Sequence, residues 1–254
     1  MRILFAVLLL FATQVWGVNT YVSPSGSDSN DCLSAGSPCL TLQAAADKAT
    51  GGAGSITGAG SVTIADGTYS GGVNVTYYKL VTFLGNCSNN SAVVISNSGG
   101  IVFNAQDHAI VTARCLTVGP GNVGFAGRQF AIVDFQDVRF GTVTTGVSAN
   151  EMSKANCAGT ITLAGNMTYY AAANGMSSVI IGCTTMFANS PTISTLAYAV
   201  GRSYISASGA GYGGSSVSLT YQYINDSSLI IQPSGGFPGY PSLPVVCQNG
   251  CIIE

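Results

Sequence analysis

The chain repeats a stretch of its own sequence after 22 residues. Residues 109–119 align with residues 131–141, with their apolar positions and their closing glycine in the same places. Each stretch is short, rich in β-branched residues and ended by glycine. A unit of this kind cannot bury its apolar face alone, so neighbouring units must stack. The repeat therefore predicts a β-solenoid, in which residues one coil apart become neighbours in space.

Short strand patterns continue along the rest of the chain. We predict strands at 61–64, 72–75, 79–84, 92–96, 100–104, 109–112, 116–118, 131–135, 138–140, 159–163, 178–181 and 199–206. One apolar residue per coil can serve as an anchor, in the order Val81, Val111, Val133, Ala155, Ile180 and Val200. An antiparallel sandwich is the competing interpretation. The internal repeat and the scarcity of two-residue hairpin turns favour the solenoid.

Residues 41–49 carry the best helix pattern of the chain. Thr41 is a suitable N-cap, and Gly51 and Gly52 end the pattern. Its apolar positions, at 42, 45, 46 and 49, form one stripe. An open solenoid end exposes strand edges and core, so we expect this helix to cover it.

The N-terminus has the pattern of a secretory signal. Arg2 precedes a run of ten apolar residues, and small-residue cleavage is predicted after Gly17. This run is too short to span a bilayer, and we expect no membrane span elsewhere. The protein is therefore predicted to be secreted or extracellular.

All eight cysteines follow the predicted signal, which favours disulfides. The spacings suggest local loops at Cys32–Cys39 and Cys247–Cys251, and staples between coils at Cys87–Cys115 and Cys157–Cys183. The chain has no CxxC pair and a single histidine, His108, so no metal site is expected.

Charge is sparse, with eight Lys and Arg against ten Asp and Glu. The absence of a basic patch argues against nucleic acid as a partner. Threonines at 142, 144, 160 and 162 suggest a hydroxyl ladder for glycans or ice, although any exposed β-sheet shows this pattern. Tyr169 and Tyr198 are among the tyrosines that could stack on sugars.

Residues 21–31, 37–45 and 64–69 (Ile-Ala-Asp-Gly-Thr-Tyr) resemble the opening of secreted proteins of the pectin-lyase-like superfamily. The resemblance implies an all-β fold, a single-stranded right-handed parallel β-helix with an N-terminal capping helix. We divide the chain into a signal peptide at 1–17, an N-terminal cap at 18–60, a parallel β-helix at 61–234 and a tail at 235–254 with a small disulfide loop. The superfamily includes lyases, glycosidases, methylesterases and proteins without known activity, so fold does not choose among them.

A methylesterase comparison gives the sharpest candidate site. The segment around Asp134 is similar to the one that holds the nucleophilic Asp of pectin methylesterases, and residues 200–203 resemble the segment whose Arg orients it. This resemblance implies Asp134 as nucleophile and Arg202 as its positioning residue. The family's second Asp, the general acid, belongs one coil earlier, where this chain has Thr112 and Ala113.

A lyase would need a carboxylate cluster for Ca²⁺ and a nearby basic residue. Asp134 and Asp137 are the densest acidic pair, with Arg139 close by. The alternative is a solvated turn with a local Asp137–Arg139 pair. Ca²⁺ is therefore expected only for a lyase, and otherwise no cofactor is expected. A glycosidase needs two carboxylates flanking the bond, which this sparse acidic set does not suggest.

These features predict a carbohydrate-associated or structural protein at the cell exterior, with extracellular polysaccharide as its partner. The alternative is a polysaccharide-acting enzyme, an esterase or lyase, that uses Asp134 and Arg202. The oligomeric state stays open.

Overall fold

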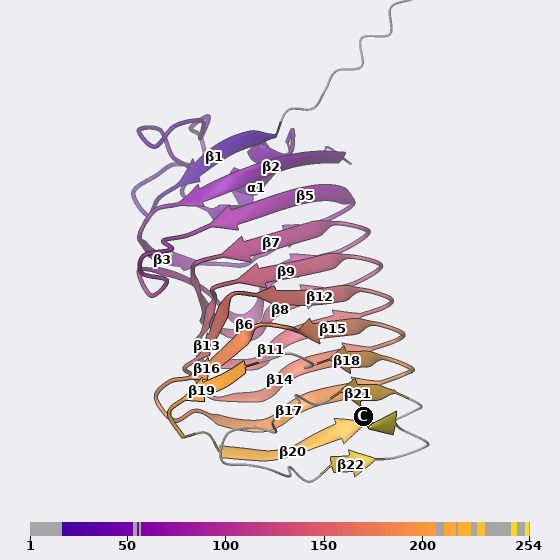
Figure 1. The fold of residues 1–254 in the computed structure, drawn as a ribbon. Coiled ribbons are helices and arrows are strands. Elements are labelled where there is room, and N and C mark those ends of the chain that lie inside the picture. The colour runs from indigo at the N-terminus through magenta and orange to yellow at the C-terminus, as the bar shows by residue number, and fades with distance from the viewer. Residues whose placement is uncertain are drawn as a thin grey trace, which may run out of the picture.

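A computed structural model shows the chain wound into a stack of parallel coils (Figure 1). It describes residues 17–52, 55, 57–206, 211–216, 218–224, 228–231, 245–247 and 252–253. The predicted signal peptide, except Gly17, lies outside the described residues. So do Cys251, and with it the predicted Cys247–Cys251 bridge, and most of the tail.

The strands of the first sheet, sheet A, run in parallel down one face of the stack. Their order is β1-β2-β5-β7-β9-β12-β15-β18-β21-β23. These are β1 (Val18–Val22), β2 (Thr57–Ile64), β5 (Tyr78–Leu84), β7 (Ile110–Arg114), β9 (Ile132–Gln136), β12 (Lys154–Ala158), β15 (Ser178–Ile181), β18 (Tyr204–Ser206), β21 (Leu229–Ile231) and β23 (Ile252–Ile253). Successive members are one coil apart in sequence, as a solenoid requires.

In the described part of the chain, the second sheet, sheet B, has thirteen strands and bends at a corner. Its upper strands are β3 (Gly67–Ser70), β4 (Val73–Val75), β6 (Val93–Ala105) and β8 (Thr117–Gly127). Strand β8 pairs with two strands of the next coil, β10 and β11. From this coil on, each coil contributes two shorter strands to sheet B, and the corner is the bend between them. Before the corner lie β10 (Arg139–Phe140), β13 (Thr160–Leu163), β16 (Thr184–Phe187) and β19 (Gly211–Gly214). After it lie β11 (Val143–Asn150), β14 (Met167–Asn174), β17 (Thr192–Val200), β20 (Ser218–Ile224) and β22 (Val245–Cys247).

The register confirms the 22-residue repeat. Val111 in β7 pairs with Val133 in β9, and Ala155 in β12 follows in the next coil. The two later anchors are wrong. The residues in register with Ala155 in the next two coils are Val179 and Ile205, and both are buried. Ile180 lies on the outer face of β15, and Val200 lies in β17 of sheet B.

The predicted strand at 199–206 is also wrong as a single element. It is divided between β17 and β18 by Gly201 and Arg202, which have φ angles of 67° and 61°. Both residues are in the left-handed region, which ends a strand and reverses the chain direction.

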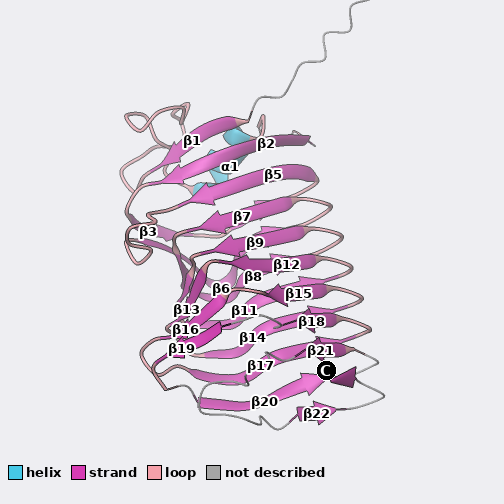
Figure 2. Ribbon diagram, in the orientation of Figure 1, coloured by secondary structure: helices cyan, strands magenta, loops and turns pink. Residues whose placement is uncertain are grey.

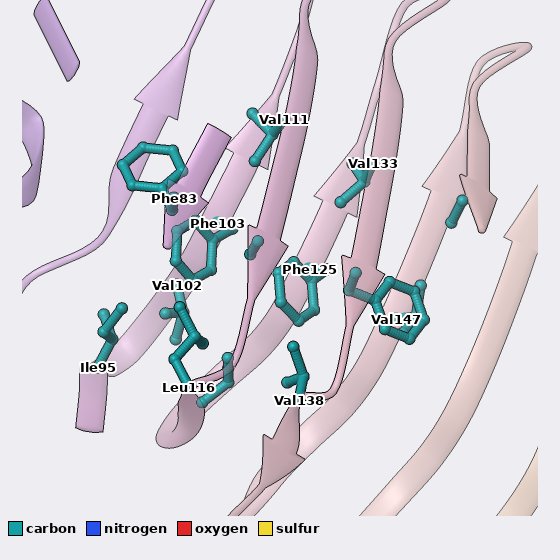
Figure 3. Close-up of a cluster of buried hydrophobic side chains, with 14 of the residues drawn as sticks. Phe83, Ile95, Val102, Phe103, Val111, Leu116, Phe125, Val133, Val138 and Val147 are labelled. Carbon is teal, nitrogen blue, oxygen red and sulfur yellow. The ribbon is translucent and has the colours of Figure 1, made fainter. Parts of the chain in front are cut away.

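The interior between the two sheets is filled by stacked side chains. The rings of Phe103 and Phe125, on β6 and β8, lie 5.1 Å apart and nearly parallel, and Phe125 stacks in turn on Phe135 at 5.2 Å. Figure 3 shows the labelled phenylalanines with Val111 and Val133 beside them. Each coil thus places apolar side chains directly over those of the coil before, and this burial stabilises the stack.

The N-terminal end of the stack is covered as predicted. Helix α1 (Leu42–Ala49) begins after Thr41, whose hydroxyl accepts a hydrogen bond from the Ala44 N–H. Its buried residues are the predicted stripe of Leu42, Ala45, Ala46 and Ala49. Figure 2 shows this helix, in cyan, behind β1 and β2.

Three of the predicted disulfides are present among the residues that the structure describes. They are Cys32–Cys39 in the loop before α1, and Cys87–Cys115 and Cys157–Cys183 between successive coils. The repeat brings these partners together, since residues about one coil apart become neighbours.

Candidate functional site

Asp134 lies on the outer face of sheet A, at the middle of β9. The neighbouring Val133 and Phe135 are buried, so strand alternation turns the Asp134 side chain toward solvent, where it is half-buried. The parallel register places Thr112 of β7 on one side of it and Asn156 of β12 on the other. The prediction that Thr112 stacks on Asp134 is confirmed.

The Asp134 carboxylate is held by the next coil. Asn156 Nδ2 donates a hydrogen bond of 2.6 Å to Asp134 Oδ1. The two Cα atoms are paired across adjacent strands, about 4.8 Å apart in this direction. The second carboxylate oxygen makes no hydrogen bond to another residue in the part of the chain that the structure describes. It is therefore available to a ligand.

A hollow of about 270 Å³ surrounds this carboxylate. Its polar lining comes from Thr112, Asp134, Gln136 and Asn156, and Cys157 contributes a wall that the disulfide to Cys183 fixes. One hydroxyl, one carboxylate and two carboxamides therefore border the hollow beside its mainly apolar surface, and these groups include both donors and acceptors.

Arg114 belongs to the same surface, although sequence reasoning did not single it out. It pairs with Gln136 and lies two residues beyond Thr112, on the same half-buried outer face of β7. This makes it a diagonal neighbour of Asp134. Its Nε atom is buried and has no hydrogen-bond partner among the described residues. The 22-residue repeat together with strand alternation could have located it.

Comparison with known proteins supports the fold and leaves the site to be argued from this chain. No family model matches the sequence, and no curated protein matches it. Among solved structures, Escherichia coli YbhC matches with a TM-score of 0.55 at 12% identity, over 90% of this chain and 75% of that one. A rice weevil pectin methyl esterase matches with a TM-score of 0.45, at 12% identity and over 90% of both chains.

The chain has a parallel β-helix fold, similar to the fold of YbhC. The resemblance drawn from the opening motifs is thereby confirmed at the level of architecture. At 12% identity the match carries over no residue role.

In this β-helix, Arg202 is not close to Asp134. It is exposed in the turn before β18, and β18 is three strands from β9 in sheet A. Three strand spacings amount to about 14 Å. The register also aligns Arg202 with the turn before β9, four residues ahead of Asp134. The structure thus does not bring Arg202 to the carboxylate that it was expected to orient.

Asp137 serves the turn after β9. Its φ angle of 53° is left-handed, and its Oδ1 accepts a hydrogen bond of 2.8 Å from the Thr160 N–H in the next coil. This carboxylate therefore supports the turn and does not face the hollow at Asp134, whose lining does not include it.

Two wider properties of the described residues bear on the site. They contain no group of three or more His, Cys, Asp or Glu side chains arranged to hold a metal ion. None of the helices among them is long and apolar enough to cross a membrane.

Proposed function

We propose that this β-helix is exported and binds polysaccharide outside the cell, through the outer face of sheet A at Asp134. The observation that carries this proposal is the Asp134 carboxylate, fixed by Asn156 in a hollow shared with Thr112 and Gln136. Three disulfides favour an oxidising compartment.

The groups around Asp134 match those of a sugar ring. Adjacent sugar hydroxyls can donate to the free carboxylate oxygen and accept from the carboxamide N–H groups. A hollow of about 270 Å³ is smaller than most enclosed ligand sites, which hold roughly 300–1,000 Å³. It therefore suits one short stretch of a polymer that continues along the sheet. This binding needs no cofactor.

Catalysis at Asp134 has less support. An ester-cleaving carboxylate needs a proton donor for the leaving alcohol. The two positions next to Asp134 in register hold Thr112 and Asn156, which are neutral. A lyase would need further carboxylates around Ca²⁺, and Asp137 is engaged at its turn.

The test measures retention of the protein in gels that contain methylated or unmethylated polyuronide. We expect Asp134→Ala to weaken binding about tenfold or more, because the hydrogen bonds lost are to a charged group. Asp107→Asn is the matched control, since it removes one negative charge in a turn away from the hollow. Chelation of divalent cations should leave retention unchanged.

Two results would contradict the proposal. One is equal retention of the Asp134→Ala variant and the unchanged protein. The other is methanol release from methylated polyuronide that disappears in Asp134→Asn, which would make the protein an esterase.

A further inference from the structure

A second groove runs along the corner of sheet B, far around the coil from Asp134. It is open to solvent, has a volume of about 430 Å³ and crosses the starts of β11, β14 and β17. Its polar lining consists of Thr142, Thr144, Asn166, Thr168, Thr192 and Ser194. We call it the corner groove.

The register arranges these side chains in two lines along the axis of the stack. Thr145 pairs with Tyr169 and Tyr169 with Thr195, so the preceding residues Thr144, Thr168 and Ser194 lie one above another. The same register aligns Thr142, Asn166 and Thr192, and Ser218 continues this line into β20.

This arrangement corrects the expected hydroxyl ladder. Thr160 and Thr162 lie in β13, which pairs with β10 and β16 before the corner. They are therefore not stacked on Thr142 and Thr144, which are at the corner and after it. Asn166 and Thr168 stack instead on Thr142 and Thr144, and Thr192 and Ser194 follow in the next coil.

The hydroxyl groups of the corner groove have no hydrogen-bond partner among the described residues. Those of Thr142, Thr144, Thr168, Thr192 and Ser194 make no hydrogen bond to any residue that the structure describes. By contrast, the hydroxyl of Thr117 donates to the Asn90 carbonyl. Asn166 Oδ1 accepts from the Thr192 N–H at 2.9 Å, which fixes the amide while its N–H groups stay available.

Two further properties define what fits this groove. None of the described residues that line it is charged, so the groove offers a charged ligand no opposite charge. Gly121, Val143 and Met167 also line it and add apolar surface beside the hydroxyls. Tyr169 and Tyr198, whose ring centroids are 5.3 Å apart, are not part of this lining. Sugars combine such apolar faces with hydroxyls.

We propose that the corner groove binds an extended, uncharged glycan that lies parallel to the axis of the stack. Hydroxyls repeat along the groove with the strand spacing of about 4.8 Å, which is close to the advance per sugar of an extended β-linked chain. Each hydroxyl can both donate to and accept from a sugar hydroxyl. The groove is shallow and open to solvent, so a chain can lie along its line of hydroxyls. This inference extends the proposed carbohydrate role to a second site. Binding at Asp134 and binding in the corner groove can therefore be refuted separately.

The test measures binding of the full chain to two soluble uncharged probes, hydroxyethylcellulose and mixed-linkage β-glucan, by affinity electrophoresis. The double variant Thr144→Val/Thr168→Val removes two hydroxyls and keeps the β-branched shape. We expect about fivefold weaker binding per hydroxyl. Thr162→Val/Thr184→Val, on strands before the corner, is the matched control and should bind as the unchanged protein does. Thr168→Arg, which fills the groove, should abolish binding.

The inference is overturned if the unchanged protein binds neither probe, or if both groove variants bind within twofold of it. Asp134→Ala separates the two proposals, because it should weaken polyuronide binding and leave β-glucan binding intact. If Asp134→Ala loses β-glucan binding while both groove variants retain it, the glycan binds on sheet A and the corner groove is refuted as its site.

Discussion

Phe103 and Phe125 stack across successive coils, with ring centroids 5.1 Å apart and planes only 9° from parallel. Both side chains are fully buried. Their contact shows how this β-helix obtains its stability: each coil supplies a layer of apolar side chains that only its neighbours can cover.

Truncation in this stack should be costly. We expect Phe125→Ala to lower the free energy of unfolding by about 3–5 kcal/mol, because it removes buried area and leaves a cavity. Phe130 is the matched control, since 48% of it is exposed. Phe130→Ala should cost well under half as much in denaturant unfolding. Equal losses would show that the coil interior does not carry the stability.

The two types of disulfide should differ in strength. Cys87 and Cys115 are 28 residues apart, and Cys32 and Cys39 only seven. Closing the longer loop removes more entropy from the unfolded chain. The resulting stabilisation is larger by about 1 kcal/mol at room temperature. Replacing Cys87 and Cys115 by Ala should therefore lower the denaturant midpoint more than replacing Cys32 and Cys39. The reverse order would show that local strain or packing outweighs loop entropy.

The helix cap offers a separate test. Thr41→Ala removes the acceptor for the Ala44 N–H and should cost about 1 kcal/mol of stability. Thr41→Ser keeps that acceptor and should restore most of the loss in thermal unfolding. If serine and alanine behave alike, the hydroxyl does not cap α1.

Alkaline pH should destabilise the fold through Tyr69. Burial, with a smaller contribution from the Asp66 charge, raises the pKa of Tyr69 from 10.0 to about 12. Its hydroxyl donates to the Ala65 carbonyl at 2.7 Å. Between these two pH values the unfolded chain loses a proton that the folded chain retains, so stability falls as pH rises.

Unfolding midpoints measured from pH 9 to pH 12 would show this fall. Tyr69→Phe should reduce the fall across the window, whereas Tyr78→Phe should not, since Tyr78 is 64% exposed. An identical pH profile for all three proteins would exclude Tyr69 as the cause.

Much of the architecture could be predicted from local patterns. The repeat predicted the pairing of Val111 with Val133, and the capping pattern predicted α1. Prediction failed where coil length changed. The later coils contain longer loops, and an error of one residue in β15 exchanges the inner Val179 for the outer Ile180.

The candidate site was predictable only in part. Asp134 was found from a motif, and its place over Thr112 follows from the repeat. The separation of Arg202 from Asp134 was not predictable, because it depends on how many coils intervene and on the turn that holds Arg202. The sequence separation of two residues in a solenoid does not determine whether they lie on the same side of the coil.

The amino-acid sequence by itself determined the period of the coil, the alternation of buried and outer residues, the helical cap and the cysteines that join neighbouring coils, because these depend on spacing of a few residues to one coil. Only the tertiary structure decided which outer residues share a surface. Arg114 beside Asp134, and the hydroxyls of Thr144, Thr168 and Ser194 in one line, arise from strand pairing across loops of unequal length. That register is set by burial of the whole stack rather than by any local segment.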